Sequence, residues 1–264
     1  MKTLKNHLIL YDSECPMCNL YTHAFTVTGM LDENGRAPYQ SMPEGVCPLV
    51  DKQRAVNEIA LVNTETGEVR YGIESLFAVI ATSFPLFRPL FSWKPFARLM
   101  RKVYAFVSYN RKVIIPARAV SGLQPSFSLK YRIAYLIFTW LVVGCILTAY
   151  APLLPIPQGG PFREYLVCGG QILFQGVVLR IYAPAKRWDY LGNMMTISLA
   201  GALLLCPIGA FRPAPLPAAA GFMLVAGLMF IEHIRRAKLL GLGWVPTITW
   251  AVYRLLILAL ILYV

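Results

Sequence analysis

The sequence is poor in charge, and above all in acidic residues. Only 14% of its 264 residues are charged, and 13 Asp and Glu face 25 Lys and Arg. Residues 75–163 contain no acidic residue at all. Because 57% of the chain is apolar, this composition argues against a wholly soluble protein and predicts a membrane protein.

Long apolar runs are missing from the first 125 residues, which have the composition of an ordinary soluble domain. From Tyr131 onward, apolar stretches of membrane-spanning length follow one another. We therefore predict a soluble domain over 1–125 and an all-α transmembrane domain over 126–264. The expected spans are 131–151, 164–183, 190–210, 216–234 and 247–264.

The second span has the weakest apolar pattern, because it carries Gln171, Gln175 and Arg180. Without it the chain would have four spans, and its C-terminus would change sides. The spacing of Gln171 and Gln175 places them on one helix face, which favours a hydrogen-bonded contact with another helix.

A secretory signal is also absent, since the apolar run before Tyr11 has only five residues. We expect a multi-pass protein of the inner, or cytoplasmic, membrane with its N-terminal domain in the cytoplasm. Loops at 186–187 and 235–238 are basic, whereas the opposite loops carry only Arg163 and Arg212. This positive-inside bias supports the same orientation and puts Val264 outside.

The net charge of +12 does not indicate a nucleic-acid-binding protein. The cations adjoin the predicted spans and form no recognition motif. We expect them to contact anionic membrane lipids instead.

Six cysteines are present, and two form the motif Cys15-Pro16-Met17-Cys18 directly after an apolar run at 7–11. A helix that begins at Pro16 would offer unpaired N–H groups that favour a thiolate. The spacing also lets the two sulfurs form a small disulfide ring. In a reducing cytoplasm such a pair is more plausibly catalytic than structural.

The sequence assigns a role to each residue of this motif. Cys15, the more exposed at the helix start, is the expected nucleophile, and Cys18 is the resolving thiol. The only redox group expected is the Cys15–Cys18 disulfide, with no separate cofactor. Asp12 would raise the pKa of Cys15, so we consider it a proton acceptor for Cys18, a cap of the turn, or a solvated turn residue.

A metal site is the main alternative for the cysteine pair. Zinc usually needs four ligands, and Cys47, His7 and His23 offer no recognisable spacing; copper(I) could use Met17. We therefore predict no metal. The remaining cysteines are single residues in the expected spans, where packing is more common than an electron relay: Cys145, Cys168 and Cys206.

The soluble part is expected to contain a strand at 7–11, a helix at 16–30 and an extended stretch at 36–41. A hairpin follows, with strands at 58–62 and 69–71, and then a helix at 73–82. This β-α-β…β-β-α order matches a thioredoxin-like α/β core. No proline stands just before the third core strand, where thioredoxins have a cis-proline, so we expect a divergent relative.

A basic amphipathic segment comes next. Its apolar residues recur at helical spacing (Phe96, Leu99, Met100, Val103 and Val107), and its polar side carries Arg98, Arg101 and Lys102. We favour packing on the soluble core over a position on the bilayer.

The stretch Tyr11-Asp12-x-x-Cys15-Pro16-x-Cys18 after a strand resembles the signature of the DCC family (DUF393) of thiol-disulfide oxidoreductases. Gly72 before a helix and Tyr109-Asn110-Arg111 at a helix end resemble later landmarks of that family. The resemblance covers about residues 6–115. It implies a thioredoxin-like fold and thiol-disulfide chemistry at Cys15 and Cys18 with Asp12 beside them.

The expected function is a membrane-anchored thiol-disulfide oxidoreductase. Its partners would be a protein or small-molecule client with a thiol or disulfide, a cytoplasmic electron donor and membrane lipids. One alternative is a transport or ligand-binding membrane protein whose soluble domain is regulatory or binds a soft metal through the cysteine pair. Another is an assembly factor that holds a partner without turnover.

Overall fold

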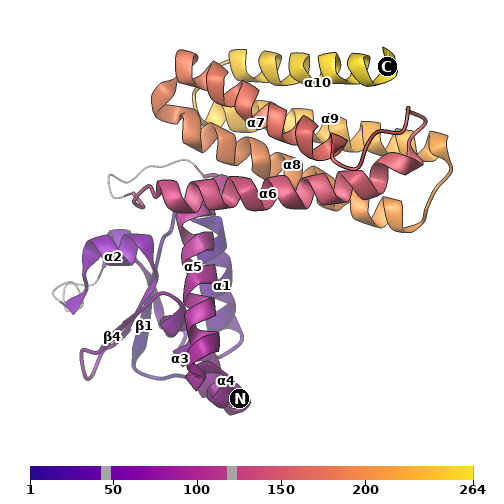
Figure 1. Ribbon diagram of the computed structural model, residues 1–264. Coiled ribbons are helices and arrows are strands. Elements are labelled where there is room, and N and C mark those ends of the chain that lie inside the picture. Colours follow the sequence, from indigo (N-terminus) through magenta and orange to yellow (C-terminus); the bar gives the residue numbers. More distant parts are fainter. Residues whose placement is uncertain (43–48, 118–123, 264) are drawn as a thin grey trace. The chain divides into compact units, whose positions relative to one another are not determined.

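The computed structural model describes residues 1–42, 49–117 and 124–263 (Figure 1). The chain divides into two compact units, Met1–Tyr131 and Arg132–Val264. The first contains the sheet and the cysteine pair, and the second is helical.

A four-stranded mixed sheet organises the first unit. Its strands are β1 (His7–Tyr11), β2 (Arg36–Pro38), β3 (Ala60–Asn63) and β4 (Val69–Tyr71), in the order β2-β1-β3-β4. Strand β1 runs parallel to β2 and antiparallel to β3, and β3 pairs antiparallel with β4. Strand β3 begins two residues later than predicted because Glu58 still serves as the C-cap of the preceding helix.

The helices of this unit are α1 (Pro16–Val27), α2 (Lys52–Asn57), α3 (Ile73–Ser83), α4 (Arg88–Ser92) and α5 (Lys94–Ile114). Short 3-10 turns occupy Tyr39–Ser41 (η1) and Pro85–Phe87 (η3). Helix α1 ends before the predicted residue 30. The reason is Gly29, whose φ of 72° is left-handed and incompatible with a continuing helix.

Both faces of the sheet are covered. The side chains of β1 point alternately to one face of the sheet and to the other. Leu8 and Leu10 pack with Val56 of α2 on one face. Ile9 points to the other face, where it joins Leu61 and Val79 of α3. The cysteine pair therefore follows a strand whose side chains are packed on both faces of the sheet.

Helix α5 is the basic amphipathic segment, and its second half packs on the core as predicted. Tyr104 packs on the cluster around Ile9, and its hydroxyl accepts a hydrogen bond from Ile59 N at 3.0 Å. Part of the expected apolar face is not covered within the first unit, however. Leu99 and Val103 are 58% and 43% exposed.

The second unit consists of α6 (Leu129–Tyr150), α7 (Arg163–Tyr182), α8 (Arg187–Ala210), α9 (Pro215–Leu239) and α10 (Val245–Tyr263). Helix α6 begins just before the boundary between the units. The 3-10 turns η4 (Ala151–Leu153) and η5 (Pro184–Lys186) adjoin α6 and α8. These five helices are long and apolar enough to span a membrane. The chain is thus a multi-pass membrane protein, and the second predicted span is a helix of 20 residues.

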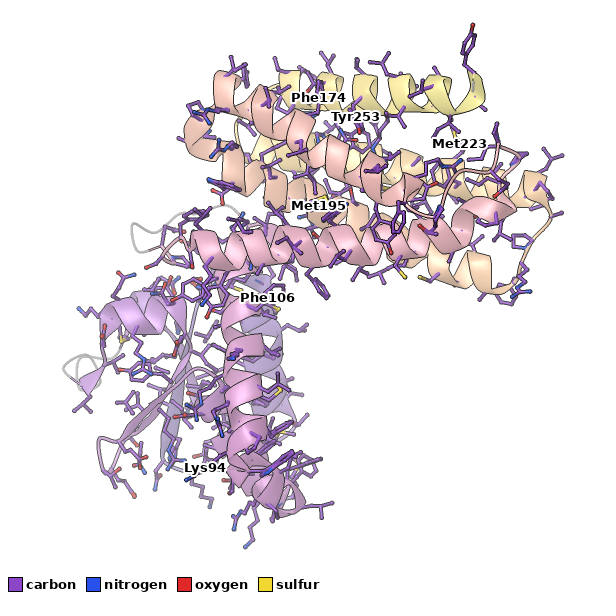
Figure 2. The ribbon with its side chains drawn as sticks, in the orientation of Figure 1. Lys94, Phe106, Phe174, Met195, Met223 and Tyr253 are labelled. Atoms are coloured by element: carbon purple, nitrogen blue, oxygen red, sulfur yellow. The ribbon has the colours of Figure 1, made fainter. Side chains whose placement is uncertain are left out.

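The helices of the second unit make both apolar and polar contacts with one another. Met195 of α8 is buried, and Phe174 of α7 stacks on Tyr253 of α10 with ring centroids 5.5 Å apart (Figure 2). The predicted polar helix contact exists at Gln175, whose Nε2 donates to Thr249 Oγ1 at 3.2 Å. Gln171 Nε2 is buried and has no partner among the described residues.

Candidate functional site

The cysteine pair lies at the junction between β1 and α1. Cys15 is the N-cap of α1, and Pro16 occupies the first helical turn. Cys15 N donates to Asp12 O at 3.1 Å, which closes the turn after β1. A proline fits there because the first helical N–H groups have no partner within the helix.

The two cysteines are free and hydrogen-bonded to each other. Cys15 Sγ accepts from the backbone N–H of Cys18 at 3.4 Å. The hydrogen bond from the Cys18 side chain, with help from that backbone N–H and the charge of Arg111, lowers the pKa of Cys15 to about 6 although burial opposes it. The pKa of Cys18 is raised by the same side-chain hydrogen bond and by burial.

Cys15 is the more exposed thiol, as predicted, but only by a small margin, since Cys15 is 7% exposed and Cys18 4%. The low exposure of Cys15 comes from the end of α5, where Arg111, Lys112 and Ile115 line the same small pocket as Cys15.

Asp12 is buried, and the interpretation as a solvated turn residue is wrong. Its Oδ2 accepts from Arg111 Nη2 at 2.7 Å, and the two side chains are only 7% and 5% exposed. Its Oδ1 accepts from Glu14 N at 3.0 Å and from Gln40 Nε2 at 2.9 Å. The capping of the turn is therefore present, while proton transfer from Cys18 stays a prediction.

Arg111 is the site residue whose role the sequence did not reveal. Its Nη2 also donates to Val56 O at 2.8 Å, and its Nε is buried without a partner among the described residues. The sequence did contain one indication that Arg111 is buried, which is its position. Tyr104, Ser108 and Arg111 follow i, i+4, i+7 spacing on the buried face of α5. A cation at such a position needs a carboxylate, and Asp12 supplies it.

Asn110 and Tyr109, which precede Arg111 in the sequence, both contact Tyr131. Asn110 Nδ2 donates to Phe106 O at 2.9 Å and to Tyr131 O at 3.0 Å. The Tyr109 ring stacks on that of Tyr131 with centroids 4.8 Å apart. These residues fix the end of α5, which positions Arg111.

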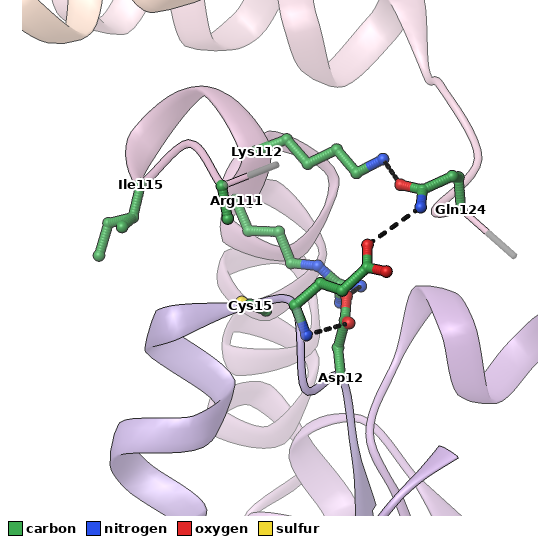
Figure 3. A pocket seen from close by; sticks show the side chains of 8 residues that line it. Asp12, Cys15, Arg111, Lys112, Ile115 and Gln124 are labelled. Carbon is green, nitrogen blue, oxygen red and sulfur yellow. Dashed lines mark hydrogen bonds and ion pairs between the residues drawn. The ribbon is translucent and has the colours of Figure 1, made fainter. Parts of the chain in front are cut away.

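Two cavities adjoin the dithiol. The one at Cys15 has a volume of about 20 Å³, and charged and polar residues line it together with Ile115 and Ala117; in it Gln124 accepts from Lys112 and donates to Glu14 Oε2 at 3.1 Å (Figure 3). The cavity at Cys18 measures about 220 Å³ and is mostly apolar. Arg111 lines both.

Over residues 1–42, 49–117 and 124–263, no three His, Cys, Asp or Glu side chains gather into a group that could hold a metal ion. His23 is exposed on α1, and Cys47 lies outside the described residues. In the helical unit, Cys145 and Cys206 are exposed and Cys168 is partly buried.

Comparisons with known proteins give no assignment: no family model, no curated protein and no solved structure matches this chain. Function must therefore be argued from the site.

Proposed function

We propose that this protein is a membrane-anchored thiol-disulfide oxidoreductase with a thioredoxin-like N-terminal domain of the DCC type. The observation that carries the proposal is the geometry of Cys15, an N-cap sulfur that accepts hydrogen bonds from Cys18. The β-α-β…β-β-α order and the mixed sheet β2-β1-β3-β4 support the thioredoxin-like core.

The first step uses the low pKa of Cys15. At pH 7 a thiol with a pKa of about 6 is mostly thiolate, the form that attacks disulfides. Cys15 Sγ bonds to one client sulfur, the client S–S bond breaks, and the second client sulfur leaves as a thiolate that takes a proton. The product is a mixed disulfide between Cys15 and the client.

The second step depends on how the pKa of Cys18 responds to the first. That pKa is raised by its hydrogen bond to Cys15, by burial and by the charge of Cys15. The two influences of Cys15 end when Cys15 Sγ is bonded to the client; burial still raises the pKa of Cys18, and the nearby charge of Arg111 still lowers it. Cys18 then loses its proton and attacks Cys15 Sγ, which forms the Cys15–Cys18 disulfide and releases the reduced client. The reverse sequence would oxidise a dithiol.

We further propose that the N-terminal unit faces the cytoplasm and receives electrons from a cytoplasmic donor. Within the helical unit, Arg132 Nη1 pairs with Asp189 Oδ1 at 3.2 Å, and Arg236 Nη1 donates to Asn193 Oδ1 at 3.0 Å. The start of α6, the start of α8 and the end of α9 thus share one end of the bundle. Their cations favour the inner, anionic leaflet.

Trapping of partners tests the function. Full-length Cys18→Ser, expressed in cells, should accumulate mixed disulfides through Cys15, which a nonreducing gel separates and mass spectrometry identifies. Cys15→Ser should trap nothing and should lose all reduction of a model disulfide. Cys206→Ser, which removes an exposed thiol of the helical unit, is the matched control and should behave like wild type.

Two results oppose the proposal. Absence of any mixed disulfide in Cys18→Ser, together with unchanged cellular activity in a Cys15/Cys18 double serine variant, would leave a partner-holding role. Stoichiometric zinc or copper in gently purified protein that is lost in that double variant would instead favour a metal-dependent regulatory domain.

A further inference from the structure

Large apolar side chains are exposed on the first unit where η3 and α4 lead into α5 (Figure 1). Leu86 is 86% exposed and Trp93 59%, and Leu90 between them is exposed as well. These three residues follow i, i+4, i+7 spacing, which places them on one side of the segment. We call them the α4 patch. A group of exposed large apolar residues is typical of an interaction surface.

Stacked aromatic rings support the α4 patch from within the first unit. The Phe91 ring of α4 stacks on that of Phe77 of α3 with centroids 4.2 Å apart, and on that of Phe96 of α5 at 6.3 Å. The Phe87 ring of η3 stacks on Phe91 at 5.9 Å. Because all four elements contribute to this stack, the α4 patch belongs to the folded unit and is not a loose connection.

Every charged residue in 84–103 is a cation. Arg88, Lys94 and Arg98 are exposed, and Figure 2 shows Lys94 at the start of α5. None of these three pairs with a carboxylate among the described residues. The neighbouring Glu74 pairs with Arg101 at 3.6 Å instead. The surface around the α4 patch therefore complements a partner that is both apolar and anionic.

The chain itself brings such a partner close. Helix α5 ends at Ile114, and α6, which is long and apolar enough to span a membrane, begins at Leu129. This connection alone keeps the first unit near a membrane surface and raises its effective concentration there. An anionic leaflet combines an apolar interior with negative headgroups, which is the chemistry that the α4 patch and its cations match.

From the exposed apolar side chains and the cations beside them we propose that the α4 patch docks on the surface of a bilayer that contains anionic phospholipids. Leu86 and Leu90 enter the border between headgroups and acyl chains, where amphipathic elements bury their apolar side chains. Trp93 suits the same depth, since tryptophan is enriched at membrane–water interfaces. Lys94 and Arg98 contact the lipid phosphates. This docking goes beyond the redox function and does not depend on it.

Crosslinking to lipid tests the docking on the full-length protein. The protein is placed in nanodiscs of phosphatidylcholine and phosphatidylserine with a lipid probe whose acyl chain carries a trifluoromethyl aryl diazirine. Illumination converts the diazirine to a carbene that inserts into nearby bonds. Mass spectrometry should find lipid adducts on the peptide with residues 84–93. Leu173, which is 73% exposed on α7, is the positive control, and the exposed Thr66 between β3 and β4 is the negative control.

A matched pair of variants tests the part of the cations. Lys94→Gln removes an exposed cation beside the α4 patch and should lower the adduct yield on 84–93 about fivefold relative to Leu173. Lys52→Gln removes an exposed cation of α2 and should leave that yield unchanged. In nanodiscs of phosphatidylcholine alone, the wild-type yield on 84–93 should fall at least about fivefold, because several cations lose their partners.

Adducts on 84–93 that are no more frequent than on Thr66 would overturn the docking, as would be seen if a protein partner or a second copy of the chain covered the α4 patch. Equal yields in Lys94→Gln and Lys52→Gln, or with and without phosphatidylserine, would overturn the contact with anionic headgroups. Both readouts are independent of the trapping of clients by Cys18→Ser, so failure of the docking and failure of the redox function are distinguishable.

Discussion

The two sides of the dithiol differ in chemistry although the two sulfurs are three residues apart. On the Cys15 side lie Glu14, Lys112 and Gln124 around a cavity of about 20 Å³. On the Cys18 side, a mostly apolar cavity of about 220 Å³ opens between three helices. The pKa values differ as well, with Cys15 lowered to about 6 and Cys18 raised, mainly because of the hydrogen bond between the two side chains. Cys15 is therefore suited to nucleophilic attack as a thiolate, whereas Cys18 stays protonated.

Arg111 belongs to both sides. It pairs with Asp12 and favours the thiolate of Cys15, and it also lines the apolar cavity beside Cys18. Arg111 thus links the two sides, whereas the difference between the two pKa values comes mainly from the hydrogen bond between the Cys18 and Cys15 side chains. Each prediction below perturbs one side, or the link between them.

The largest effect is expected for Arg111→Met. It leaves the Asp12 carboxylate buried without its partner, and breaking a buried ion pair on one side typically costs about 3–5 kcal/mol. Urea unfolding of the full-length protein, followed by pulse proteolysis, should show this loss of stability.

A matched variant separates charge from packing. Asp12→Asn combined with Arg111→Met removes both charges and should recover much of the lost free energy. If the double variant is no more stable than Arg111→Met alone, the Asp12–Arg111 pair does not stabilise this junction.

Tyr104→Phe perturbs the apolar side. The substitution removes the acceptor of the buried Ile59 N–H, which costs about 1–3 kcal/mol. Unfolding measurements should detect this loss, whereas the pH dependence of Cys15 alkylation should not change. A large shift in that pH dependence would mean that the two sides are not independent.

The pH profile of alkylation tests the difference between the thiols. With a pKa of about 6, Cys15 should react with iodoacetamide at a rate that rises up to about pH 6 and is nearly constant above pH 7. At pH 7 it should react at least about tenfold faster than Cys18, because the lower nucleophilicity of a low-pKa thiolate offsets only part of its greater abundance. Peptide mapping of the alkylated protein measures both rates; equal rates would contradict the asymmetry.

The smallest effect is expected for Gln40→Ala on the polar side. It removes one hydrogen bond to Asp12 Oδ1, worth about 0.5–1.5 kcal/mol, and the exposed acceptor of Ser13 N, which water can replace. Glu14 N and Arg111 still contact the carboxylate. Unfolding should show a small decrease, and a loss as large as that of Arg111→Met would mean that Gln40, not Arg111, holds Asp12.

Much of this fold follows from local patterns in the sequence. The strand before Asp12, Pro16 at the helix start and the five apolar helices all correspond to signals of period, length or capping. The burial of Cys15 and Asp12 does not, because it comes from α5, about 100 residues later in the chain. Contacts over such a separation leave no local signal; only Arg111 on an otherwise buried helix face hinted at them.

The most direct test is a redox titration of the full-length protein in glutathione buffers, followed by alkylation and mass analysis of the peptide with Cys15 and Cys18. The account predicts one two-electron transition in which both sulfurs lose alkylation together and Cys145 and Cys206 do not. Alkylation of Cys15 and Cys18 as free thiols at every glutathione ratio would contradict it.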